Sequence, residues 1–184
     1  MIYKGSTKIK DVYFGSTKIK EIYHGSTLVY SSGGYPSGTI LFENATAGTY
    51  TLQVDYNCTV SVDLVGGGSC ASASRKGASG AYISGTISLS SGTYTIIIGD
   101  GGIANDTYDG GNSTFNSNTA GCGIFSSSGG TGGTATVVTT GLTGQNGISN
   151  SNVGWINGYG AGGSVASSPS RRTGVAGYCK IEVV

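Results

Sequence analysis

The chain has 184 residues, 35 of them glycine, with 10% charged residues and a formal net charge of +1 at pH 7. A nucleic-acid-binding protein needs a basic face to replace the counterions around the phosphates, so this charge excludes nucleic acid as an expected partner. Apolar residues make up 37% of the chain, but its 12 tyrosines and its short alternating runs of Ile and Val argue against a disordered polymer.

The first residues, MIYKGSTKIK, lack the apolar run that follows the basic start of a secretory signal. No stretch approaches the 18 or so apolar residues of a membrane-spanning helix. We therefore expect a chain made in a cytoplasm and not inserted in a membrane.

A ten-residue repeat occupies residues 1–30, reading IYKGSTKIKD, VYFGSTKIKE and IYHGSTLVY. Its β-branched and aromatic residues predict three or four very short strands, joined by turns at Gly-Ser-Thr. A unit this small cannot bury a core alone, so the segment is expected to mediate attachment or oligomerisation. The expected contact residues are Tyr3, Ile9, Tyr13, Ile19 and Tyr23.

Residues 31–38, SSGGYPSG, are typical of a linker, and residues 39–184 are expected to form one domain. Alternating apolar and polar residues predict strands at 39–43, 49–55, 59–65, 82–89, 93–98 and 178–184. In the third of these, Val60, Val62 and Leu64 share one face, and Ser-Ser-Gly at 90–92 predicts a hairpin. Short strands with short turns and no helical periodicity indicate an all-β fold, a β-sandwich.

Glycine-dense segments lie between the predicted strands, and they have two possible structures. They are either disordered loops or packed polyglycine-II helices, which are extended threefold helices without internal hydrogen bonds. In the second case each backbone N–H and C=O must bond to a neighbouring helix, because buried backbone groups need partners.

The order of these elements resembles a known family. VSVDLVGGGS, AYISGTISLSSGTYTIIIGDGG, DGGNSTF, TAGCG, GYGAGG and GVAGYCKIEVV follow one another between residues 60 and 184. This is similar to the glycine-rich domain of bacteriophage tail fibre and adhesin proteins, and the decapeptide repeats are similar to the N-terminal repeats of phage fibres. The resemblance implies a location in the virion, a homotrimer, and receptor binding by loops at the tip.

Aromatic and basic residues set among glycines are the candidate receptor contacts, because Trp, Tyr and Arg dominate binding hot spots. They are Tyr108, Trp155, Tyr159, Arg171 and Arg172, together with the apolar Ile156 beside Trp155. An alternative for Trp155 and Tyr159 is that they plug the end of the sandwich or separate glycine helices. Phe115 and Phe125 are expected in the core.

The sequence offers few groups for catalysis, and we expect no enzymatic activity. His24 is the single histidine, and it occupies a repeat position where Lys4 and Phe14 stand in the sister copies, which indicates a surface turn. No GxSxG motif precedes a helix.

No cofactor or metal is expected. Asp100, Asp106 and Asp109 could hold calcium, but without the spacing of an EF-hand they are expected to hydrogen-bond to turn backbones. The four cysteines contain no CxxC pair, which argues against zinc, and they are expected to be small buried hydrophobes in reduced form.

We therefore expect a virion structural protein at a fibre tip that contributes to binding a bacterial surface receptor, either protein or glycan. Residues 1–30 would contact other virion proteins. The alternative is a capsid or tail decoration protein, such as a head fibre, with a purely structural role.

Overall fold

The computed structural model describes residues 3–4, 7–8, 12–14, 16–19, 21–24, 27–31, 34–104, 108–164 and 173–184. It confirms the all-β fold: two five-stranded antiparallel sheets pack against each other as a β-sandwich. Within the described residues no α-helix occurs, and one 3-10 turn, η1 (Ile156–Gly158), is present. No helix in that part of the chain is long and apolar enough to cross a membrane.

The decapeptide repeats form three small hairpins with the same register. The paired strands are β1 (Tyr3–Lys4) with β2 (Thr7–Lys8), β3 (Val12–Phe14) with β4 (Thr17–Ile19), and β5 (Glu21–His24) with β6 (Thr27–Ser31). In each hairpin the repeat tyrosine lies opposite the residue five positions later: Tyr3 opposite Lys8, Tyr13 opposite Lys18, and Tyr23 opposite Leu28. The prediction of three or four strands was therefore too low, because each repeat folds back on itself and contributes two.

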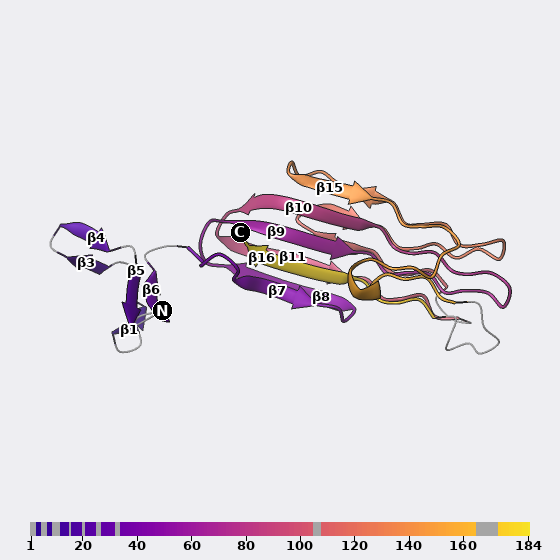
Figure 1. Ribbon diagram of the computed structural model, residues 1–184, viewed down its shortest axis with the longest axis horizontal. Coiled ribbons are helices and arrows are strands. Elements are labelled where there is room, and N and C mark those ends of the chain that lie inside the picture. Colours follow the sequence, from indigo (N-terminus) through magenta and orange to yellow (C-terminus); the bar gives the residue numbers. More distant parts are fainter. Residues whose placement is uncertain are drawn as a thin grey trace.

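One sheet of the sandwich, here the front sheet, has the order β15–β10–β9–β16–β7. Its strands are β7 (Ile40–Asn44), β9 (Cys58–Val65), β10 (Tyr82–Leu89), β15 (Leu142–Gln145) and β16 (Tyr178–Val183). The back sheet has the order β14–β13–β12–β11–β8, with β8 (Gly48–Val54), β11 (Gly92–Ile98), β12 (Ser113–Phe115), β13 (Asn118–Ala120) and β14 (Ala135–Thr136). Figure 1 shows the front sheet from β15 at the top to β7 at the bottom.

The core lies between the sheets and follows the predicted alternation. Val60, Val62 and Leu64 point inward from β9, each at most 1% exposed. They meet inward residues of the back sheet such as Val54 and Ile96. Burying an aliphatic side chain of this size contributes about 1.5–3 kcal/mol, so the alternating strands supply the main stabilisation of the sandwich.

The predicted hairpin at residues 90–92 is wrong. β10 pairs with β9 and β15 in the front sheet, whereas β11 pairs with β8 and β12 in the back sheet. Ile87 and Leu89 of β10 and Ile96 and Ile98 of β11 are all buried in the shared core. The turn therefore carries the chain across the edge of the core from one sheet to the other, because both strands bury an apolar face there.

The glycine-dense segments form a packed bundle that continues from one end of the sandwich. We call the following segments the glycine bundle: 66–70, 77–81, 99–102, 108–111, 121–123, 130–134, 147–151, 160–163 and 174–177. Three consecutive amides of the central segment 66–70 donate to three different neighbours: Gly66 to Ala81 O, Gly67 to Gly111 O and Gly68 to Val175 O, each at 2.9 Å. Ser69 and Cys70 then return to the first two of these neighbours, donating to Ala78 O and Tyr108 O. A repeat of three residues, with each amide bonded to another segment, is the arrangement of packed polyglycine-II helices and not of disordered loops.

Carbonyl groups of the central segment are also bonded. Gly67 O, Gly68 O and Ser69 O accept from Gly123, Gly102 and Gly163, at 2.8, 2.8 and 2.9 Å. The central segment thus has six hydrogen-bonded neighbours, namely 77–81, 108–111, 174–177, 121–123, 99–102 and 160–163. These six also bond to one another around a closed ring, through the donors Gly77, Gly160, Gly177, Gly111, Gly110 and Ala81.

Glycine is required in the bundle because the segments approach without room for a Cβ atom. A Cβ built on Gly67 would lie 2.8 Å from the carbonyl carbon of Asp100, and the carbonyl oxygen would be closer still. Where a bundle residue is not glycine it is often small, as with Ala78 and Ser79, both of which are buried. The bundle is therefore rigid backbone that the sandwich holds at its end.

Candidate functional site

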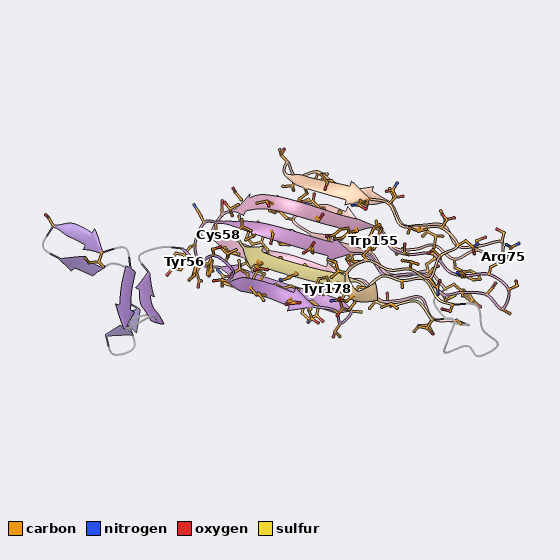
Figure 2. All side chains as sticks on the ribbon, viewed as in Figure 1. Tyr56, Cys58, Arg75, Trp155 and Tyr178 are labelled. Atoms are coloured by element: carbon orange, nitrogen blue, oxygen red, sulfur yellow. The ribbon has the colours of Figure 1, made fainter. Side chains whose placement is uncertain are left out.

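The end of the glycine bundle is the first candidate site. The chain enters the sandwich and finishes at the same end, where Gly38 N donates to Val183 O at 2.7 Å. The bundle extends from the opposite end, and Figure 2 shows Arg75 at its far limit. The loops that join bundle segments there include 71–76 and 124–129. We call this far end the tip.

Exposed apolar and basic side chains gather at and beside the tip. Ile103, Tyr108 and Ile124 are 44%, 45% and 42% exposed, so they give this end of the bundle an apolar surface. Arg75 and Lys76 are also exposed there. Their loop is ordered by Ser72, whose N–H donates to Arg75 O and whose Oγ accepts from Arg75 N at 2.9 Å. Such a surface can combine apolar contact with charge.

Tyr108 stacks on Phe125, with ring centroids 4.9 Å apart and 25° between the ring planes. Asp109 Oδ1 accepts a hydrogen bond from Phe125 N at 2.6 Å, which holds the backbone that carries the Phe125 ring. The expectation that Phe125 belongs to the core is wrong, since it is only half-buried, whereas Phe115 is 1% exposed as expected. At the level of Phe125 the interior consists of packed glycine backbone, which leaves no space for a ring.

Trp155, Ile156 and Tyr159 do not lie at the tip. They belong to the turn around η1, beside the first residues of β10 and β16, as the labels of Trp155 and Tyr178 show in Figure 2. Trp155 Nε1 donates to Gly80 O at 2.6 Å, which ties the turn to the base of the bundle. All three side chains are half-buried. The turn therefore joins the bundle to the front sheet, and a receptor contact through these side chains stays a prediction.

Two tyrosines of the front sheet pack against the aromatic residues of this turn. Tyr82 stacks under Trp155, with centroids 5.4 Å apart, and Tyr178 stacks under Tyr159, at 4.7 Å with 3° between the planes. The Tyr82 hydroxyl donates to Asp63 Oδ1. We call Tyr82, Trp155, Tyr159 and Tyr178 the aromatic platform.

Tyr82 and Tyr178 of the platform are held in the neutral form. Burial and the hydrogen bond to Asp63 raise the pKa of Tyr82. Burial and a hydrogen bond to Glu43 Oε1, 2.7 Å long, raise the pKa of Tyr178 strongly. Each hydroxyl therefore stays a donor to its carboxylate at neutral pH. Sequence reasoning missed both pairs, because they join residues on different strands and appear only when the register is known.

Several other predicted contact residues lie outside the described part of the chain, or their side chains do. Arg171, Arg172 and Ile9 are among the residues that the structure does not describe. Tyr3, Tyr13 and Tyr23 lie on β1, β3 and β5, and Ile19 on β4 is half-buried. Their role in attachment stays a prediction.

The described residues offer little for metal binding. No group of three His, Cys, Asp or Glu side chains among them could hold a metal ion. Asp109 bonds to the backbone of Phe125, as expected for a turn aspartate, and Asp106 lies outside the described residues.

The four cysteines are thiols. Cys70 and Cys179 are buried as expected, but Cys58 and Cys122 are only half-buried. Burial raises the pKa of Cys58, Cys122 and Cys179, so none of these three is an activated nucleophile. A shallow pocket at the linker end of the sandwich is lined by Cys58 and the polar residues Asn57, Thr59, Ser88 and Ser90, with Leu89. It brings no base to the thiol.

Comparison of the chain with known proteins gave no match to a protein family, to a curated protein or to a solved structure.

Proposed function

We propose that this chain is a non-enzymatic structural protein of a bacteriophage particle, placed at the tip of a tail or head fibre. In this proposal the loops at the tip bind a receptor on the bacterial surface. The sequence resemblance to phage fibre and adhesin domains motivates the location. The observation that carries the proposal is the glycine bundle, a rigid backbone rod that presents exposed side chains at the end farthest from the chain entry.

A rigid support favours binding because it removes much of the entropy cost of ordering the contact residues. Immobilising a flexible side chain costs about 0.5–1.5 kcal/mol at an interface. Tyr108 is already fixed against Phe125, and the loop of Arg75 is fixed by Ser72. Less of the favourable contact energy between the tip and the receptor is then offset by the entropy cost of ordering these side chains.

The test uses the full chain as a competitor of phage adsorption to host cells. The purified protein should bind cells and block adsorption, and the Ile103→Ser/Tyr108→Ser variant should lose most of that effect. A matched control is Ile97→Ser/Val138→Ser, which removes two exposed apolar side chains away from the tip. Undiminished competition by the tip variant, with folding intact, would contradict the assignment of the receptor site.

The second candidate is a decoration protein with a purely structural role. The three hairpins in identical register favour it, because a repeated unit can dock on a repeated shell. It predicts many copies per particle and normal adsorption by particles that lack the protein. Labelled virions viewed by electron microscopy separate the two candidates.

Residues 1–30 would mediate the contact with other virion proteins and the assembly of a homotrimer. Deleting them should leave a folded monomer by light scattering. Persistent trimers after the deletion would move the oligomer interface to the sandwich.

A further inference from the structure

The aromatic platform consists of two similar stacked pairs, Tyr82 with Trp155 and Tyr178 with Tyr159, side by side on the front sheet. Tyr82 on β10 and Tyr178 on β16 both lie opposite Val65, on either side of β9. The two tyrosines are therefore two strand spacings apart, about 9.6 Å at the usual 4.8 Å per strand. Each leans across the sheet toward the carboxylate of the next strand, Asp63 for Tyr82 and Glu43 for Tyr178. Each also carries a second, partly exposed ring on top.

The upper rings, Trp155 and Tyr159, are fixed before any ligand arrives. Stacking on Tyr82 and Tyr178 orients both ring planes, and Trp155 is further held by its hydrogen bond to Gly80 O. Rigid aromatic rings provide contact area at low entropy cost. The two stacked pairs stand on strands about 9.6 Å apart, a spacing close to the length of a disaccharide unit in an extended glycan.

Polar groups beside the rings suit sugar hydroxyls. A carboxylate has about four lone-pair sites, so Asp63 and Glu43 can each accept from a ligand while holding a tyrosine. Among the residues of the front-sheet strands, Lys180 is the one basic side chain, and it forms an ion pair with Glu182 at 2.6 Å. With Asp63, Glu43 and Glu182 nearby, the charge of this face is acidic, which disfavours phosphorylated or uronic polymers.

We propose that the aromatic platform is a binding site for a neutral glycan chain, lying across the front sheet with sugar faces on Trp155 and Tyr159. Sugar hydroxyls donate to Asp63 and Glu43. The site is separate from the tip and does not rest on receptor binding there.

The chain provides its own probe, because Trp155 is its single tryptophan. The full chain is titrated with three neutral hexasaccharides: cellohexaose, maltohexaose and chitohexaose. At least one should change the fluorescence of Trp155 saturably, and galacturonate hexasaccharide should not. If none of the neutral sugars produces a saturable change, the proposal is wrong.

Variants measured by calorimetry locate the binding. Tyr159→Ala should weaken the affinity about tenfold, through the lost stacking surface. Glu43→Gln keeps an acceptor for Tyr178 and should weaken it about threefold, through a weaker bond to sugar. Circular dichroism checks that both variants are folded, and the second tests the site without removing a ring.

Tyr108→Ala is the matched control, because it removes an exposed aromatic ring at the tip. It should bind the hexasaccharide with unchanged affinity. Binding that survives both platform variants but is lost in this control would place the glycan at the tip and overturn the proposal. Competition with phage adsorption tests only the tip. If the tip hypothesis fails, the fluorescence and calorimetry results still decide whether the platform binds glycan.

Discussion

The close packing of the glycine bundle makes a single methyl group costly, and Gly67→Ala in the central segment is the strongest test. The new Cβ would lie 2.8 Å from Asp100 C and 3.1 Å from Gly111 N, with Asp100 O closer still. Ordinary contacts begin near 3.4 Å, and the atoms in the way are backbone, which cannot rotate aside. Segment 99–102 would have to move outward.

That movement is resisted by hydrogen bonds on several sides. Gly102 N donates to Gly68 O, and Gly111 N donates to Asp100 O, both at 2.8 Å. Overpacking a well-packed interior usually costs about 1–3 kcal/mol, and we expect about 3 kcal/mol here because no side chain can yield. For a chain of this size that corresponds to a melting temperature lower by about 6–12 °C.

The control is Gly158→Ala, at a position where no atom lies within 4 Å of the added Cβ. Its φ of +87° makes alanine unfavourable by about 1 kcal/mol, so backbone conformation alone should lower the melting temperature by about 2–4 °C. Thermal and denaturant unfolding, followed by circular dichroism, measure both variants. If Gly67→Ala costs no more than Gly158→Ala, the bundle is not close-packed and the reasoning fails.

Three further outcomes are expected. Stability should fall as pH rises above about 10, because the raised pKa values of Tyr82 and Tyr178 mean that the folded state holds their hydroxyl protons more tightly than the unfolded state does. The Tyr178→Phe variant should be less stable at pH 7. Its loss of stability at alkaline pH, measured by denaturant titrations, should be smaller than that of the unmodified chain. Asn118→Ala should lower the free energy of unfolding in urea by about 2–4 kcal/mol, because the buried Asn118 amide bonds to three acceptors and two backbone donors. Asn152→Ala, at an exposed position, should lower it by less than about 0.5 kcal/mol. The amides of segment 66–70 should exchange as slowly as those of β9, and exchange at loop rates would refute the bundle.

The sequence was sufficient to predict the strands in which apolar and polar residues alternate with a period of two. The predicted strand at residues 82–89 coincides with β10, and the inward face of Val60, Val62 and Leu64 was predicted correctly. The short strands β12, β13, β14 and β15 were missed. Three-residue and two-residue strands such as Ser113–Phe115 and Ala135–Thr136 are too short to show a period.

Pairing between distant residues was decided only by the tertiary structure. The turn at 90–92 looks like a hairpin in sequence, but burial of Ile87 and Ile96 in one core separates its strands into different sheets. Likewise, Tyr82 meets Asp63 and Trp155 only through sheet register, which no local pattern encodes.

Glycine composition alone permitted either slack loops or a packed bundle. The sequence determined that backbone could approach backbone at Gly66, Gly67 and Gly68, since no side chain stands in the way. Only the sandwich, by fixing where each segment starts and ends, brings six neighbours around that segment at hydrogen-bonding distance. Because a lone polyglycine-II helix has no hydrogen bonds of its own, its rigidity is a property of the assembled fold and not of any one segment.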